Sequence, residues 1–347
     1  MQVTKQEIQD NLTKLVKQYV PSLQNEEITR ETPINSKGYE SLNYIYIVCT
    51  LESDYNVKIP DKVWMKLRSR RSRGRSLRYG NEKIILRNFA KQPLNHTKNM
   101  DKVNDLIYTV RKKMLADDVT MFRKLRPSVL LRLIQEISIA HTEALGAGRA
   151  KTLDKGVLWV VARMKIEISR LPSYDETVTI ESFAGKTLRV LFPRYYEMLD
   201  ESGNTLVKAS AVWLLMDEKT RHMAFPEEYG VEIPSLEKDI GISLPCGVSL
   251  GTQKNKKNFV ASYSRVDING HMNNSKYVDE AEDLLGAEYL ETHEMKSLEI
   301  EFKSEIKYGA HVRLEYTING DELTMAGYVR KRPCFALTAK FACTEQK

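Results

Sequence analysis

Three polar side chains that could do chemistry stand at alternate positions in the C-terminal third of the chain. They are the carboxylate of Asp267, the carboxamide of Asn269 and the imidazole of His271. Because alternate side chains of an extended segment point the same way, we expect these groups to line one face. The stretch 274–285 is predicted to be a helix with an Asn cap and a Gly stop. Free N–H groups at its start would favour developing negative charge beside the three side chains.

The elements that must position these groups follow a pattern that occurs twice from about residue 100 onward. Each copy has an apolar helix, at about 126–145 and at 274–285, followed by segments of alternating polarity that predict strands. The expected strands are 106–110, 157–168, 176–183, 189–192 and 207–215 in the first copy, and 297–302, 310–316, 323–329 and 335–341 in the second. The strand after each helix aligns at a constant offset of 134, which places Ile166 on Ile300. We therefore predict the α+β class, with an antiparallel sheet wrapped around a helix in each copy.

A fourth candidate, Glu305, follows His271 and is expected on or just past the strand after the second helix. The repeat offset places Leu171 at the corresponding position of the first copy, which also lacks the Asp-x-Asn-x-His pattern. A carboxylate, an amide and an imidazole together could activate water and stabilise an oxyanion. The asymmetry predicts one active site, in the second copy.

The first 62 residues predict a small helical module that precedes the repeat. A helix is expected over 4–20, and a second apolar-faced helix follows Glu40-Ser41-Leu42. These residues, with the downstream Ile59-Pro60-Asp61, resemble an acyl carrier protein, whose attachment site is an Asp-Ser-Leu at the start of its second helix. The resemblance implies 4'-phosphopantetheine as a cofactor on Ser41; the plain alternative is a helix N-cap. It ends after Asp61, so the module is either truncated or divergent.

Residues 63–100 are strongly basic and are expected to form a linker. They carry 11 Lys and Arg residues and a single acid, Glu82. The run 66–78 could be a solvated linker, a patch that steers acidic carrier proteins, or a surface for nucleic acid or anionic membrane. No aromatic residues interleave with the arginines, so nucleic acid is the least favoured partner.

Composition bounds the compartment and the assembly. No apolar run is long enough for a membrane helix, and the polar N-terminus does not resemble a signal peptide. The four cysteines are scattered without metal-ligand spacing, so we expect free thiols, a cytoplasmic location and no metal. A double unit supplies its own sheet partner; we expect a monomer or a homodimer.

Residues 101–345 resemble the acyl-ACP thioesterases of plants and bacteria, which are double hot-dog proteins. The resemblance is carried by the stretches 157–164, 211–216 and 290–295 and above all by Asp-x-Asn-x-His-x-Asn-Asn at 267–274. It implies hydrolysis of fatty acyl thioesters on acyl carrier protein, either a free one or the chain's own module. It also implies that the unit 101–235 holds the acyl chain and that 250–347 is catalytic. Some members have Cys directly after the glutamate that matches Glu305; Ile306 stands there, which excludes that thiol nucleophile.

The predicted catalytic set is therefore Asp267, Asn269, His271 and Glu305. Glu305 would activate water, Asp267 would orient its neighbours, and the other two would position the thioester. Whether Glu305 or Asp267 takes the proton stays open, and each residue could instead serve only a turn or a solvated surface. The alternative functions are a non-catalytic acyl-chain or acyl-carrier binding module and an acyl-CoA hydrolase.

Overall fold

The computed structural model describes residues 5–20, 23–28, 41–55, 57, 59 and 106–344. They belong to two units, Met1–Asp101 and Lys102–Lys347. In the first unit, α1 (Lys5–Tyr19) and α2 (Ser41–Asp54) pack through the apolar faces predicted for them. The rings of Tyr19 and Tyr46, for example, have centroids 5.1 Å apart. The side chain of Ser41, the run 66–78 and the rest of 60–105 lie outside the described residues.

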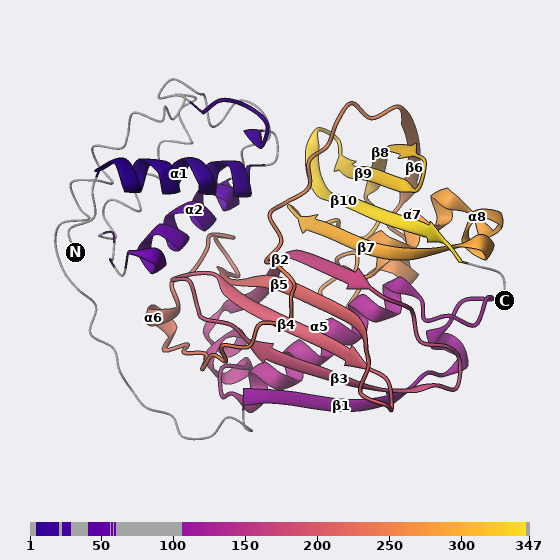
Figure 1. The fold of residues 1–347 in the computed structure, drawn as a ribbon, viewed down its shortest axis with the longest axis horizontal. Helices are drawn as coiled ribbons and strands as arrows, with labels where there is room; N and C mark the ends of the chain where they lie inside the picture. The colour runs from indigo at the N-terminus through magenta and orange to yellow at the C-terminus, as the bar shows by residue number, and fades with distance from the viewer. Residues whose placement is uncertain are drawn as a thin grey trace. The chain divides into compact units, whose positions relative to one another are not determined.

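The second unit contains both copies of the repeat (Figure 1). The first copy consists of β1 (Ile107–Lys113), α5 (Pro127–Ala144), β2 (Val157–Ile168), β3 (Thr177–Ala184), β4 (Phe192–Leu199), β5 (Thr205–Asp217) and α6 (Pro226–Tyr229). The second copy consists of β6 (Asn255–Val260), α7 (Lys276–Leu285), α8 (Ala287–Thr292), β7 (His293–Phe302), β8 (His311–Asn319), β9 (Glu322–Val329) and β10 (Arg332–Cys343). The α+β class predicted from the sequence is confirmed.

The ten strands form one antiparallel sheet in the order β1-β3-β4-β5-β2-β7-β10-β9-β8-β6. The order has the same pattern from either edge, because each copy contributes five strands and the copies meet where β2 pairs with β7. At the centre of that pairing Lys165 lies opposite Glu299. Their numbers differ by 134, the offset that the sequence predicts, so the two copies are related across this residue pair.

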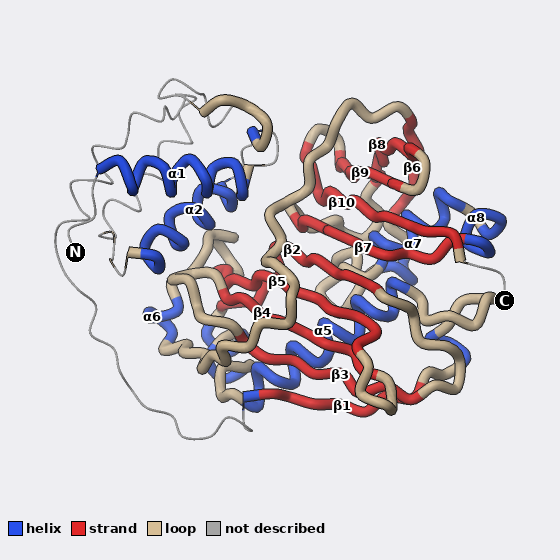
Figure 2. The backbone as a smooth tube through the Cα atoms, viewed as in Figure 1, coloured by secondary structure: helices blue, strands red, loops and turns tan. Residues whose placement is uncertain are grey.

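The helices and the connection between the copies cover opposite faces of the sheet (Figure 2). α5 and α7 contact each other and pack their apolar residues into one core that both copies share. On the other face, the Ser210 hydroxyl donates to the Ser243 carbonyl at 2.8 Å, which fixes the connecting segment 231–254 across the strands. Among the described residues, no helix is both long and apolar enough to span a bilayer.

Two local predictions were wrong. The strand expected at 189–192 begins instead at Phe192, because 188–191 form a tight turn in which Arg189 has a φ of 53°. The second helix begins at Lys276 rather than 274, because Asn273 and Ser275 make a turn before it. The Gly stop is confirmed: Gly286, at φ 80°, ends α7. A shorter helix, α8, then follows.

Candidate active site

The segment that carries three of the predicted site residues is a tight hairpin, not the extended stretch that the sequence suggested. Val266 and Met272 pair across it, and the Asp267 N–H donates to the His271 carbonyl at 2.9 Å. Gly270, at φ 71°, turns the chain back and donates its N–H to the Asp267 carbonyl at 3.0 Å. Asp267 and His271 therefore lie opposite each other across a turn. The continuous strand-like alternation from 267 to 271, on which the prediction of one shared face rested, is not present.

Within this hairpin Asp267 has a structural task. Its Oδ1 accepts the N–H of Asn269 at 2.8 Å, which is the hydrogen bond of an Asx turn. Asn269 lies at the exposed tip. The sequence left open that Asp267 shapes a turn, and one of its carboxylate oxygens does form such a turn.

His271 and Glu305 are brought together, as the catalytic hypothesis requires. The Met272 N–H donates to the Ile306 carbonyl at 2.7 Å, which pins the hairpin to the segment just past β7. The His271 Nε2 consequently lies 3.3 Å from the Glu305 Oε2. The His271 side chain is 18% exposed and that of Glu305 is 40% exposed, so a water molecule can reach the carboxylate.

Arg221 completes this cluster and was missed by the sequence reasoning. Its Nη1 lies 3.1 Å from the Glu305 Oε1 and its Nη2 lies 3.2 Å from the Oε2, so the guanidinium contacts both carboxylate oxygens in a bidentate manner. It stands in the turn after β5, where the Asp217 carboxylate accepts the Thr220 N–H at 2.6 Å and Arg221 itself has a φ of 56°. The first copy therefore contributes to a site that was predicted to belong to the second copy alone.

The start of α7 adjoins this cluster. Asn273 Oδ1 accepts the N–H of Ser275 at 3.0 Å and its hydroxyl at 2.8 Å, so this asparagine organises the helix start. Tyr277 is buried in the same turn. Its burial, followed by the nearby Cys334, Asp267 and Glu305, raises the pKa of the phenol. Both candidate carboxylates thus lie within electrostatic reach of Tyr277, which stays protonated and able to donate a hydrogen bond.

A buried ion pair, also missed from the sequence, holds the hairpin against α7. The Arg265 guanidinium, just before the hairpin, contacts the carboxylate of Glu280, which is 1% exposed. The first copy has a similar ion pair with the charges exchanged. There the acid, Asp118, precedes the helix and the base, Arg132, lies on α5, with the Asp118 Oδ1 3.2 Å from the Arg132 Nη2. The Glu280 carboxylate of α7 thus has a structural role and not a catalytic one.

Within the described part of the chain, no three His, Cys, Asp or Glu side chains are placed to hold a metal ion. Ser41, the predicted phosphopantetheine residue, belongs to the other unit. The cluster is suited to acyl transfer, because it places an accessible carboxylate beside an imidazole, a guanidinium and hydrogen-bond donors.

Solved structures share this fold. An acyl-ACP thioesterase from Bacteroides thetaiotaomicron superposes with a TM-score of 0.60 at 20% identity, over 70% of this chain and 100% of that one. A 12:0-ACP thioesterase from Umbellularia californica gives a TM-score of 0.60 at 19% identity, over 69% of this chain and 98% of that one.

Sequence comparison agrees with the fold. An acyl-[acyl-carrier-protein] hydrolase of Cuphea viscosissima, named as chloroplastic, is 29% identical over 188 residues, which are 50% of this chain and 45% of that protein. The chain thus spans about half the length of this relative. Residues 105–231 match the model of the acyl-ACP thioesterase N-terminal domain, and residues 249–330 match that of the C-terminal domain. These two matches cover more than half of the sequence, and the chain belongs to the acyl-ACP thioesterase family.

Proposed function

We propose that this protein hydrolyses the thioester of fatty acyl-[acyl carrier protein], releasing a free fatty acid and the carrier. The contact between the His271 Nε2 and the Glu305 Oε2, at 3.3 Å, carries the proposal. It joins an accessible carboxylate to an imidazole in the copy that matches the C-terminal thioesterase domain. Family membership supports the choice of an acyl-carrier substrate.

In the proposed reaction the Glu305 carboxylate takes a proton from water while the water oxygen attacks the thioester carbonyl carbon. The electrons of the C=O bond move onto its oxygen, where Asn269 and His271 supply hydrogen-bond donors. The tetrahedral intermediate then collapses, the C–S bond breaks, and the proton on Glu305 goes to the leaving thiolate. The products are a fatty acid and the pantetheine thiol.

Arg221 is proposed as a positioning residue that acts through Glu305. A bidentate guanidinium fixes the plane of a carboxylate and keeps an oxygen directed at a defined point. Asp267 is proposed to act in the same indirect way, by holding the hairpin that presents Asn269 and His271. We therefore assign the proton transfer to Glu305 and not to Asp267.

The test measures free fatty acid released by the full chain from matched palmitoyl-carrier and palmitoyl-CoA substrates. Faster release from the carrier thioester is expected. Equal rates would instead identify an acyl-CoA hydrolase. No release from either substrate, together with tight binding of the palmitoyl-carrier, would leave the non-catalytic binding module as the function.

We further propose that Ser41 carries a phosphopantetheine arm, so that the substrate can be presented by the chain's own module. Tethering would raise the effective concentration of the thioester at the site. Intact-mass measurement after incubation with a phosphopantetheinyl transferase tests this, with Ser41→Ala as the control. A gain of one pantetheine arm by the wild type alone is expected; an unmodified wild type would contradict it without affecting the proposed hydrolysis.

A further inference from the structure

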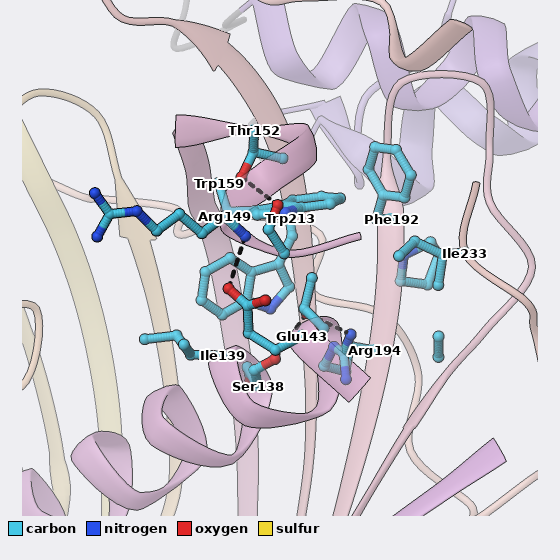
Figure 3. A pocket seen from close by; sticks show the side chains of 14 residues that line it. Ser138, Ile139, Glu143, Arg149, Thr152, Trp159, Phe192, Arg194, Trp213 and Ile233 are labelled. Carbon is cyan, nitrogen blue, oxygen red and sulfur yellow. Dashed lines mark hydrogen bonds between the residues drawn. The ribbon is translucent and has the colours of Figure 1, made fainter. Parts of the chain in front are cut away.

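A pocket of about 150 Å³ lies in the first copy, between the end of α5 and the strands β2, β4 and β5. Its walls are largely apolar and include three aromatic side chains, Trp159, Phe192 and Trp213, that face the same space (Figure 3). Among the charged lining residues, Glu143 and Arg149 are exposed, whereas Arg194 is buried. The lining therefore combines exposed charged side chains, apolar walls and one buried guanidinium group.

Arg194 is an unusual group to find there, because only 5% of it is exposed and its partners are all neutral. Its Nη1 donates to the Nδ1 of His141 at 2.7 Å and to the Ser182 hydroxyl at 3.1 Å. Its Nη2 donates to the Thr142 hydroxyl at 3.0 Å. Within the described part of the chain, no carboxylate forms an ion pair with Arg194. The carboxylate of nearby Glu143 instead accepts the backbone N–H of Arg149 at 2.7 Å.

His141 adds an unsatisfied polar atom to the same cluster. Arginine is a donor only, so the Nδ1 of His141 must accept and its proton must sit on Nε2. Burial, and then the charge of Arg194, lowers the pKa of His141 to about 4, so the ring is neutral at physiological pH. Its Nε2 is buried and has no hydrogen-bond partner in the described structure. The cluster thus holds one positive charge and no anion.

A buried cation without a counter-charge is costly, because the guanidinium loses its hydration and gains only neutral acceptors. We propose that the pocket binds the carboxylate end of an aliphatic chain, with the carboxylate on Arg194 and the chain along the aromatic walls. One carboxylate balances one guanidinium, whereas a phosphate would bring excess negative charge and an alcohol would bring none.

Two ligands have this chemistry. One is a free fatty acid, which under the proposed function is the enzyme's own product, so the pocket would provide feedback inhibition. The other is an acyl thioester whose far end bears a second carboxylate. The binding site itself does not depend on the proposed hydrolysis; only the identification of the free acid as product does.

The test is calorimetric titration of the full chain with octanoate and with 1-octanol, which share the alkyl chain and differ in charge. Octanoate is expected to bind at least about 10-fold more tightly, since a charged hydrogen bond is worth a factor of roughly 10 to 100. Arg194→Met should abolish this preference while leaving octanol binding unchanged. Arg149→Met, which removes an exposed lining guanidinium, is the matched control and should change octanoate binding less than about 3-fold.

Equal binding of octanoate and octanol by the wild type would overturn the proposal, as would full octanoate affinity in Arg194→Met. If that variant does not fold, Thr142→Val replaces it, because the cation stays but loses the hydroxyl that orients it. Octanoate binding should then weaken about 3- to 10-fold, and an unchanged affinity would contradict the proposal.

Kinetic measurements distinguish the two candidate ligands. Inhibition of octanoyl-carrier hydrolysis by octanoate, relieved in the Arg194 variant, identifies the free acid. Preferential hydrolysis of an ω-carboxyoctanoyl-carrier, lost in the same variant, identifies the dicarboxylic chain. If neither carrier thioester is hydrolysed, the proposed function fails, while the calorimetry still decides the pocket.

Discussion

The hairpins 120–124 and 267–271 occupy equivalent places in the two copies and have the same backbone. In each, the first residue donates its N–H to the carbonyl of the fifth, at 2.8 and 2.9 Å. In each, the fourth residue has a positive φ, 60° at Arg123 and 71° at Gly270. The following residue of each hairpin donates its N–H to the segment after the central strand: Leu125 to Pro172 at 2.8 Å and Met272 to Ile306 at 2.7 Å.

The side chains of the two hairpins differ in a way that distinguishes turn-forming groups from the groups that we assign to the reaction. Thr120 corresponds to Asp267, and its hydroxyl accepts the Phe122 N–H at 3.3 Å just as the Asp267 carboxylate accepts that of Asn269. The turn-forming acceptor is therefore present in both copies. Lys124 stands at the place of His271, and the offset puts Leu171 at the place of Glu305. The groups found only in the second copy are those we assign to the reaction.

Replacing His271 by its counterpart should have the largest effect among these exchanges. His271→Lys places an ammonium group beside Glu305 and removes the imidazole, and kcat for acyl-carrier hydrolysis should fall at least about 100-fold. Steady-state release of fatty acid measures this. The matched control is Lys124→His in the first copy, which should leave the rate unchanged; a comparable loss in the control would show that both hairpins serve only stability.

Removing Arg221 tests whether the first copy contributes to the site. Arg221→Met should lower kcat about 10-fold with little change in KM, because the Glu305 carboxylate is still present but less well oriented. Arg221→Lys should restore part of the loss. Arg332→Met is the control, since that guanidinium donates to the backbone carbonyl of Glu305. Unaltered kinetics in Arg221→Met would remove the first copy from the reaction.

Replacing Asp267 by Thr, the residue at the equivalent position of the other hairpin, tests whether Asp267 forms the turn or transfers the proton. Asp267→Thr keeps a turn-forming acceptor, so activity should fall less than about 5-fold, whereas Asp267→Ala should cost more because the Asx turn is lost. Fatty acid release by the two variants, compared at equal thermal stability, provides the measurement. A collapse of activity in Asp267→Thr would make Asp267 a proton-transfer group.

Glu282 on α7 is expected to show the smallest effect, on stability alone. Burial, then Asp279, raises its pKa to about 7 despite the opposing charge of Arg126. The native state therefore holds a proton that the unfolded chain releases near pH 4, and stability falls as pH rises from about 4.5 to 7. Glu282→Gln, which introduces the residue found at Gln135 in α5, should stabilise the protein by about 1 to 2 kcal/mol at pH 8. The melting temperature should not change at pH 4; an equal gain at both pH values would contradict the assignment.

The sequence predicted the repeat well because its elements depend on local patterns. Alternating and β-branched residues located β2 at its observed bounds, and the helix expected at 126–145 was placed within a residue of α5. The repeat offset of 134 reappears in the sheet, where Lys165 pairs with Glu299. These features follow from hydrophobic periodicity, which needs no knowledge of distant contacts.

The site was only partly predictable. His271 and Glu305 could be paired because the resemblance to the acyl-ACP thioesterases implies that both belong to one site. Arg221 could not be predicted as part of the site. It lies in a turn after β5 of the first copy and reaches Glu305 of the second copy, and no local sequence pattern indicates that contact. The hairpin was mistaken for a strand because Gly270, with its positive φ, reverses the chain where residue alternation suggests that it continues.

The decisive measurement is single-turnover hydrolysis of an acyl-carrier thioester by Glu305→Gln, run beside its binding affinity. Glutamine preserves the shape of the side chain but cannot accept the proton of water. We expect the rate of hydrolysis to fall about 1000-fold or more while the affinity for the acyl-carrier changes less than about 3-fold. Hydrolysis at the wild-type rate by this variant would show that the reaction does not pass through Glu305, and the proposed active site would be wrong.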